Sequence, residues 1–195
     1  MEDLDRLRAW QRGDASAGNE LFRDHFPSIR RFFASKVGPD SVDDLVQRTF
    51  TACVDAAADF RGEGSFRAFL FGIARKQLYR HLERFARADR RNASVGVSSV
   101  QDLGQSPTSV IAAQQGGDVL LRALQSLPVE QQALLELHYW ENLGAAEIAC
   151  AMDVESGTVR VRLHRARAAL RTAVLHEFGD EADLDDAARR LGRLL

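Results

Sequence analysis

Residues 143–171, LGAAEIACAMDVESGTVRVRLHRARAALR, form the most informative stretch of this 195-residue chain. Its first part has apolar residues at helical spacing, and Met152 and Val154 mark a tight turn after it. The second part opens at Glu155 and Ser156 and carries an apolar stripe made of Val159, Leu163, Ala166 and Leu170. A short helix, a tight turn and a second helix with one apolar stripe are typical of a helix-turn-helix.

The other faces of the second helix are strongly basic. From Arg160 to Arg171 there are five arginines and no acid, so no acid three or four residues away neutralises them. The alternative is a surface αα-hairpin whose arginines only keep it soluble, although such a helix usually mixes charges of both signs. Cations on the exposed side of a helix-turn-helix favour contact with DNA.

The composition favours a soluble protein of one or two small domains. The chain is 45% hydrophobic and 28% charged, with a net charge of −2. No run approaches the ~20 apolar residues that a membrane span requires, and the acidic start MEDLDRLRAW differs from a signal peptide. We expect a cytoplasmic location. Cys53 and Cys150 have no neighbouring metal ligands and are expected to be buried thiols.

Charge is distributed unevenly along the chain. Residues 75–91 hold seven Lys or Arg against two acids, whereas residues 177–195 hold six acids against three Arg. The only charged residue within 94–117 is Asp102. Local basic patches, and not the overall charge, would therefore supply contacts with phosphates.

Hydrophobic periodicity is helical almost throughout, and no alternating β-branched run predicts a strand. The predicted fold class is all-α, with two small helical domains, a flexible linker and a C-terminal helix-turn-helix. Helices are predicted at 2–12, 16–37, 40–59, 65–91, 118–126, 128–141, 144–151, 155–175 and 181–194. The Ser-, Gln- and Gly-rich linker cannot form a packed core. The predicted boundaries are a first domain 1–92, a linker 93–117, a second domain 118–176 and an acidic amphipathic extension 177–195.

Four motifs, in this order, resemble the extracytoplasmic-function (ECF) sigma factors, the smallest members of the sigma-70 family of bacterial RNA polymerase. They are VDDLVQRTFTACVDAAADF (42–60), FRGEGSFRAFLFGIAR (60–75), ARKQLYRHLERFARADRR (74–91) and ALQSLPVEQQALLELHYWENLGAAEIA (123–149), the last leading into the helix-turn-helix. The resemblance implies that residues 1–92 act as sigma region 2, which docks on core polymerase and binds and melts the −10 element. Residues 118–176 would act as sigma region 4, which holds the −35 element.

In the family, the first motif docks on a coiled coil of the polymerase β′ subunit. The resemblance assigns core polymerase contacts to Asp43, Asp44, Leu45, Gln47 and Arg48. The apolar positions expected to pack inward are Leu45, Val46, Phe50 and Val54. Arg48 stands where the family usually has an acid, which reverses the sign of one contact.

The second and third motifs resemble the loop and helix that bind the −10 strand. Glycines allow close approach of the backbone, cations meet phosphates, and apolar walls hold an unstacked base. The resemblance assigns −10 contacts to Phe60, Arg61, Gly62, Phe66, Arg75, Lys76, Arg80 and Arg84. Phe60 and Phe66 are expected to be partly exposed and Phe69 to lie in the core. The family often has Asn and Asp at positions 76 and 80. We therefore expect these positions to bind the −10 strand, but we infer no preference for a particular −10 sequence.

The helix-turn-helix resembles the −35 reader of the family. The resemblance assigns −35 contacts to Thr158, Arg160, Val161, Arg162, His164 and Arg165. Thr158 and Arg162 are expected to meet phosphates, while the other four face the major groove. Val161 could read a thymine methyl group. In the preceding helix, Gln132 replaces the arginine that is usual in the family.

The predicted function is therefore that of an RNA polymerase sigma factor that initiates transcription at specific promoters. Expected partners are the core polymerase β′ and β subunits, promoter DNA and an anti-sigma factor, without direct membrane insertion. No cofactor, metal site or catalytic residue is predicted, and the chain is not expected to be an enzyme, because no phosphate loop, HExxH or nucleophile–base pattern occurs. A further hypothesis is that the acidic extension folds against a basic face and restrains DNA binding.

One alternative is another helix-turn-helix regulator, LuxR-like or operator-binding, without sigma activity. Its receiver domain would need alternating strands, whereas residues 1–93 predict helices only. A helical adaptor or an anti-sigma factor is the other alternative, and it would have to explain two separate basic faces.

Overall fold

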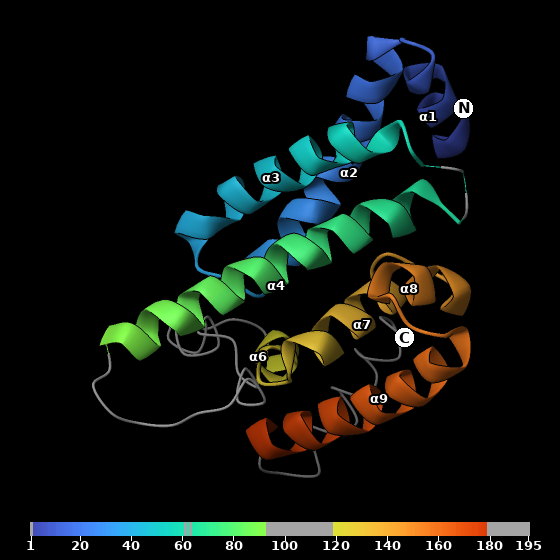
Figure 1. Ribbon diagram of the computed structural model, residues 1–195. Helices are drawn as coiled ribbons and strands as arrows, with labels where there is room; N and C mark the ends of the chain where they lie inside the picture. The colour runs from blue at the N-terminus through green and yellow to red at the C-terminus, as the bar shows by residue number, and fades with distance from the viewer. Residues whose placement is uncertain (1, 61, 63, 93–118, 179–195) are drawn as a thin grey trace.

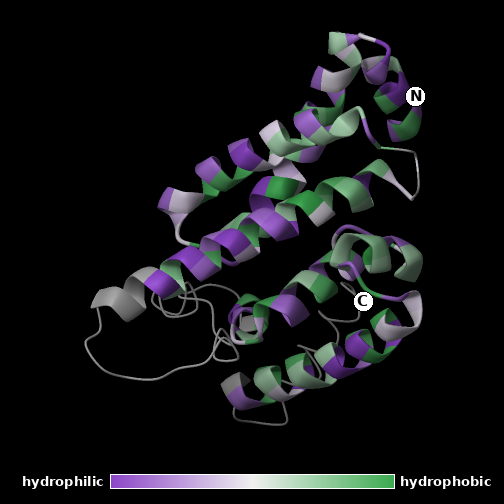
Figure 2. Cartoon of the chain, in the orientation of Figure 1, coloured by the Kyte–Doolittle hydropathy of each residue, from purple (hydrophilic) through white to green (hydrophobic). Residues whose placement is uncertain are grey.

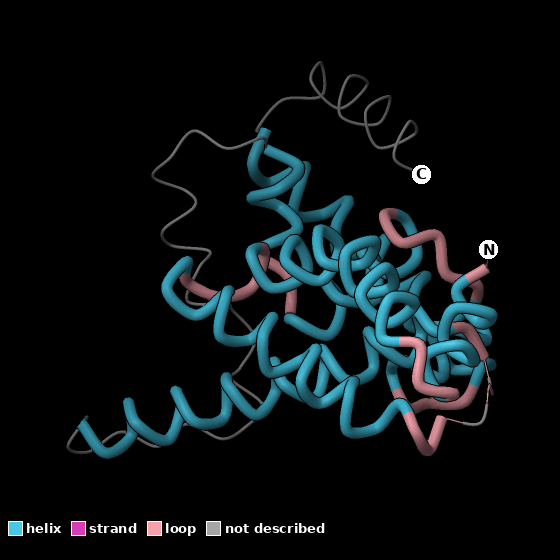
Figure 3. Tube along the Cα trace, turned by 90° about the horizontal axis from the view of Figure 1, so that it is seen from above, coloured by secondary structure: helices cyan, strands magenta, loops and turns pink. Residues whose placement is uncertain are grey.

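The computed structural model describes residues 2–60, 62, 64–92 and 119–178. Within these residues the chain forms eight helices and no strand (Figure 3). The all-α prediction is thereby confirmed. The predicted linker, the predicted helix at 181–194 and Arg61 lie outside the described residues.

The N-terminal unit consists of four helices, α1 (Asp3–Gln11), α2 (Ala15–Ala34), α3 (Pro39–Ala57) and α4 (Phe66–Asn92). Helix α2 begins after Asp14, whose carboxylate accepts hydrogen bonds from the backbone N–H groups of Ser16 and Ala17 at 3.0 and 3.3 Å, as a helix cap does. It continues through Pro27. Pro39 occupies the start of α3, where its missing N–H costs no helical hydrogen bond.

Helix α4 lies along α2 and α3, and all three contribute to the core of this unit (Figure 1). Phe33, Leu45 and Leu78 are fully buried there. Val54 was predicted to pack inward, but its side chain is 49% exposed. That prediction was wrong because Val54 lies on the outer face of α3, beside exposed Asp55.

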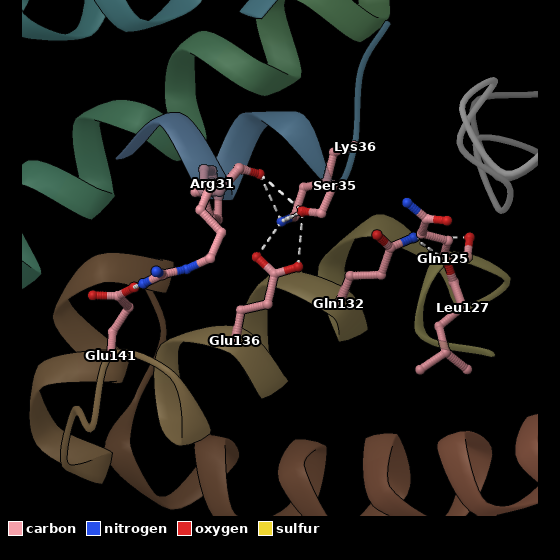
Figure 4. Close-up of polar contacts among 9 residues, drawn as sticks. Arg31, Ser35, Lys36, Gln125, Leu127, Gln132, Glu136 and Glu141 are labelled. Atoms are coloured by element: carbon pink, nitrogen blue, oxygen red, sulfur yellow. Dashed lines mark hydrogen bonds and ion pairs between the residues drawn. The ribbon is translucent and has the colours of Figure 1, made fainter. Parts of the chain in front are cut away.

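The C-terminal unit consists of α6 (Val119–Gln125), α7 (Val129–Tyr139), α8 (Ala145–Met152) and α9 (Ser156–Phe178). Helix α9 packs against the other three. Gln132 is buried, and its side-chain amide donates to the backbone oxygens of Gln125 and Leu127 at 3.2 and 2.7 Å (Figure 4). The glutamine that replaces the family's usual arginine thus holds the turn between α6 and α7.

The two units lie against each other, with α8 packed on α4 (Figure 1). Their buried apolar side chains form one continuous cluster. The sequence predicts two domains but not this contact. Cys53 is buried as predicted, whereas Cys150 is exposed. The prediction for Cys150 was wrong because α8 turns Ile148 and Met152, and not Cys150, toward the core.

Candidate nucleic-acid interface

The helix-turn-helix is built from α8, a tight turn and α9. The backbone N–H of Gly144 donates to the Glu147 carboxylate at 2.9 Å, which caps the start of α8. Asp153 ends α8 with a positive φ of 55°, a conformation in which Asp is tolerated. The N–H of Val154 then donates to the carbonyl of Ala149 at 3.0 Å. These bonds fix the direction in which α9 leaves the turn.

One face of α9 is buried against the rest of its unit, as the sequence predicts. The buried residues at helical spacing are Val159, Leu163, Ala166 and Leu170. The opposite face carries four exposed residues that were predicted to read bases: Arg160, Val161, His164 and Arg165. Since the buried stripe fixes the rotation of α9, these four side chains are presented together to solvent.

The two predicted phosphate contacts on α9 are only partly exposed. Thr158 and Arg162 are both half-buried. The guanidinium of Arg162 forms an ion pair and a hydrogen bond with Glu130 of α7. An acid from a neighbouring helix therefore pairs with one cation of this face, which local spacing along α9 could not predict.

The first half of α4 is largely buried. Phe66 is fully buried, so the prediction of its partial exposure was wrong. Its ring packs against His25 with centroids 5.4 Å apart. Phe60 and Phe69 are both half-buried and lie 4.5 Å apart between ring centroids. Phe69, expected in the core, packs against the core cluster but is only partly buried. Position 66 faces α2, which explains its complete burial.

From Lys76 onward, α4 carries an exposed basic stripe. Its described cations are Lys76, Arg80, Arg84 and Arg87, all exposed. Hydrophilic residues follow this part of α4 in Figure 2. Arg75 differs from them, because it is half-buried and its Nε donates to the backbone oxygen of Ala151 in α8 at 3.2 Å. Gly62, in the loop before α4, is exposed with a φ of +79°.

Helix α3 presents a mixed polar surface to solvent. Asp43, Asp44, Gln47 and Arg48 are exposed, and Arg48 Nε donates to Asp44 Oδ1 at 2.9 Å. Leu45 is fully buried. It was assigned to the polymerase contact set, but its position allows it only to hold α3 in place.

An aromatic patch beside this surface was not predicted. Phe26 of α2 is 45% exposed, and its ring stacks on that of half-buried Phe50 with centroids 6.2 Å apart. Exposed Val54 lies one turn after Phe50 on α3. Phe26 stands next to buried His25 and three residues before buried Ile29, so helical spacing alone gives no signal of its exposure.

Two basic helical surfaces, one of them on a helix-turn-helix, define the chain as a helix-turn-helix DNA-binding protein. Two family models match it: sigma-70 region 2 over residues 21–88 and sigma-70 region 4 over residues 117–170. The chain therefore belongs to the sigma-70 family, as an ECF RNA polymerase sigma factor. Members of this family are transcription initiation factors.

Curated relatives agree with the family models. The chain is 28% identical over 170 residues to the ECF RNA polymerase sigma-E factor of Escherichia coli K12, covering 82% of this chain and 87% of that protein. It is 26% identical over 166 residues to the sigma-E factor of Haemophilus influenzae, covering 80% and 87%.

Solved structures show the same fold. CnrH, in complex with the cytosolic domain of CnrY, matches with a TM-score of 0.65 and 26% identity over 89% of this chain and 97% of that one. The sigma factor RpoE of Bartonella quintana, in complex with the anti-sigma factor NepR, matches with a TM-score of 0.61 and 21% identity over 80% and 95%. Among the described residues, no helix is long and apolar enough to cross a bilayer.

Proposed function

We propose that this chain directs core RNA polymerase to specific promoters by reading two DNA elements with its two helical units. The observation that carries the proposal is the pair of exposed basic surfaces, on α9 and on α4 from Lys76 onward. Each surface lies in a range that matches a different sigma-70 region. A regulator that reads a single DNA element would need only the basic surface on α9.

We assign the −35 element to α9. Arg160, His164 and Arg165 provide donors for base edges, and Val161 provides an apolar contact for a thymine methyl group. Thr158 and Arg162 would contact phosphates, Arg162 after leaving Glu130. Base contacts give sequence preference, whereas phosphate contacts position the duplex.

The −10 element is assigned to α4 and the loop before it. Lys76, Arg80 and Arg84 are exposed cations suited to the phosphates of a single strand. Phe60, Arg61 and Gly62 would supply the loop contacts. Phe66 is buried and is proposed only to hold α4 against α2, and Arg75 becomes available when its bond to α8 is broken.

Core polymerase docking is assigned to the exposed polar surface of α3. Asp43, Asp44, Gln47 and Arg48 would contact the β′ subunit, and the patch of Phe26, Phe50 and Val54 would extend the contact with apolar area. The β subunit and promoter DNA complete the set of partners. In this proposal no cofactor or catalytic residue is needed, and the chain is not an enzyme.

We also propose the domain limits 1–92 and 118–176, with 93–117 as the linker and 177–195 as an extension, in a protein that works in the cytoplasm. The CnrH structure holds the cytosolic domain of CnrY. Together with the family resemblance, this supports a regulatory protein partner, an anti-sigma factor, for this chain.

In vitro transcription with core polymerase and a promoter library tests the function. The expected result is initiation from a defined subset of promoters, absent with core polymerase alone. The double variant R160A/R165A should lose that selectivity while keeping its helical content. Promoter binding without any initiation would contradict sigma activity and point to a conventional helix-turn-helix regulator.

A further inference from the structure

Helix α1 is fixed on α2 by an ion pair and by an aromatic contact. The Arg6 guanidinium donates to the Asp24 carboxylate at 2.6 Å. At the other end of α1, the ring of Trp10 lies on Gly18, where a Cβ atom would be only 2.8 Å from two atoms of that ring. This close packing requires glycine. The Trp10 ring also meets the Phe22 ring edge-on, with centroids 5.2 Å apart.

From this fixed helix, the side chain of Gln11 reaches the end of α3 and the start of the proposed −10 contacts (Figure 1). Its Nε2 donates to the backbone oxygen of Ala57 at 2.8 Å and to that of Phe60 at 3.1 Å. Ala57 is the last residue of α3, so its carbonyl has no N–H partner within the helix. Gln11 therefore ties α1 to the turn that leads from α3 to Phe60.

This contact depends on hydrogen-bond donors at position 11. The turn is closed by the Phe60 N–H, which donates to the Ala57 oxygen at 3.3 Å, and the carbonyls of both residues accept from one side-chain nitrogen. A glutamine amide supplies two N–H donors to such a pair of acceptors. A glutamate of the same shape supplies none when ionised, and a methionine of similar length supplies none at all.

The ring of Phe60 is held from the other side, by α4. Its centroid lies 4.5 Å from that of Phe69, and the Phe69 ring lies 6.3 Å from that of fully buried Phe66. The backbone of Phe60 is thus held by α1, and its side chain by α4. Phe60 and Phe69 are both half-buried, so part of this aromatic pair faces solvent and can form a wall for an unstacked base.

The described residues that follow Phe60 include two exposed glycines with positive φ. Gly62 has a φ of +79° and Gly64 a φ of +87°, values that other residues rarely adopt. The next anchored residue is Ser65, whose hydroxyl accepts from the Ala68 N–H at 3.2 Å at the start of α4. The backbone here is therefore anchored at Phe60 on the α3 side and at Ser65 on the α4 side.

We infer that Gln11 is a positioning residue for −10 recognition, which holds Phe60 in the orientation that receives an unstacked base. This inference rests on the proposed function of Phe60. A site that is ordered in advance binds its ligand without the cost of ordering it. Gln11 is exposed, so water can replace its hydrogen bonds and their loss costs little global stability. Loss of Gln11 should therefore weaken binding of the −10 strand and leave −35 binding unchanged.

The first experiment measures the order of the turn in the full-length chain without DNA. Hydrogen exchange is followed at the amides of Asp59 and Phe60, which are both hydrogen-bonded in the turn after α3. Exchange should be at least ~5-fold faster in Q11M and Q11E, because the turn loses two bonds. Q11K keeps a donor and should remain near wild type. N19M, at an exposed position of α2, is the control. Unchanged exchange in Q11M and Q11E would overturn the inference.

The second experiment uses each variant assembled with core polymerase, on a promoter from which the wild-type chain initiates. Fluorescence anisotropy compares a single-stranded probe of the −10 non-template strand with a duplex probe of the −35 element. Q11M and Q11E should lose at least ~5-fold in affinity for the strand and keep their affinity for the duplex. Q11K should bind the strand like wild type. N19K adds the same charge on α2 and reports what a cation contributes without the contact.

Two outcomes would overturn the inference: strand affinity in Q11M equal to wild type, or equal losses on the strand and the duplex, which would indicate general destabilisation. A gain in N19K that matches the difference between Q11K and Q11M would also overturn it, because charge alone would then account for the rescue. If the wild-type holoenzyme initiates from no promoter while exchange behaves as expected, the proposed function is wrong, and Gln11 only fixes the turn after α3.

Discussion

Arg162 of α9 forms an ion pair with Glu130 of α7, so a cation in the proposed −35 interface is already partnered inside its own unit. The side chains are 37% and 49% exposed, so solvent screens the pair and its contribution to stability is small. The ion pair instead affects the binding of DNA. A phosphate must compete with Glu130 for the same guanidinium.

The variant E130Q should therefore strengthen binding to duplex DNA of any sequence. Release of Arg162 adds about one phosphate contact, which steepens the dependence of log affinity on log salt by about one unit. Fluorescence anisotropy with specific and scrambled duplexes at several salt concentrations measures both effects. The control E155Q makes the same charge change at an exposed position with no such partner. Equal gains in E155Q and E130Q would show that only net charge matters.

Replacing Arg165 by alanine should change the sequence preference of DNA binding, whereas replacing Arg162 by alanine should change the affinity for any sequence. R165A should relax sequence preference at one −35 position and cost about 1–3 kcal/mol on the specific duplex, because a base-edge donor is lost. R162A should weaken specific and scrambled duplexes alike. Competition binding against a set of single-substitution duplexes distinguishes the two. A uniform loss for both variants would remove the assignment of Arg165 to base contact.

Alanine substitution in the core of the helix-turn-helix should lower the free energy of unfolding far more than substitution on its exposed face. Ile148 is fully buried, and I148A should cost about 2–5 kcal/mol through lost burial and the cavity left behind. V161A, at a side chain that is 51% exposed, should change stability by less than about 0.5 kcal/mol. Urea unfolding followed by circular dichroism measures both. Similar losses in the two variants would mean that α9 is rotated from the orientation described.

Helix positions could be predicted from the sequence because each carries a local signal. The apolar stripe from Val159 to Leu170 is such a signal, and these residues are buried along one face of α9. Exposure was harder to predict. Phe66 and Phe69 are separated by a single helical turn, and which of them faces α2 depends on how α4 is rotated against that helix.

The contacts between the units had no signal in the sequence. Lys36 and Glu136 form a buried ion pair between the units although a hundred positions separate them, and a lone lysine after a helix resembles any solvated surface residue. Glu141 likewise gives no local indication that Arg31 and Arg67 will enclose it. Which charged residues pair over long sequence distances depends on how the helices pack. The candidate DNA-binding surfaces could therefore be predicted from the sequence, but the residues that form ion pairs between the units could not.

The two cysteines should react very differently with alkylating reagents. Cys53 is buried, which raises the pKa of its thiol to about 12, so almost no thiolate forms at pH 8. Cys150 is exposed. Iodoacetamide at pH 8 should therefore modify Cys150 alone in the folded chain, and both residues in urea, as read by peptide mass spectrometry. Rapid native modification of Cys53 would contradict its burial in the α2–α3–α4 core.

His81 should make the N-terminal unit less stable as the pH falls. Burial, together with the nearby charge of Arg84, lowers the pKa of His81, although Asp44 opposes the shift. The unfolded chain, with an ordinary histidine pKa near ~6.5, then binds more protons than the folded chain in this window. The stabilising effect of the neutral ring is therefore present above the unfolded pKa and is lost as the pH drops below it.

H81Q removes this proton linkage and keeps a polar side chain of similar size. Between pH 7.5 and 5.5 the unfolding midpoint in urea should fall less in H81Q than in the wild-type chain. H164Q provides the matched control, because His164 is exposed on α9 and its substitution should leave the wild-type pH dependence in place. Parallel pH profiles for the wild-type and H81Q chains would show that His81 binds its proton equally well in the folded and unfolded states.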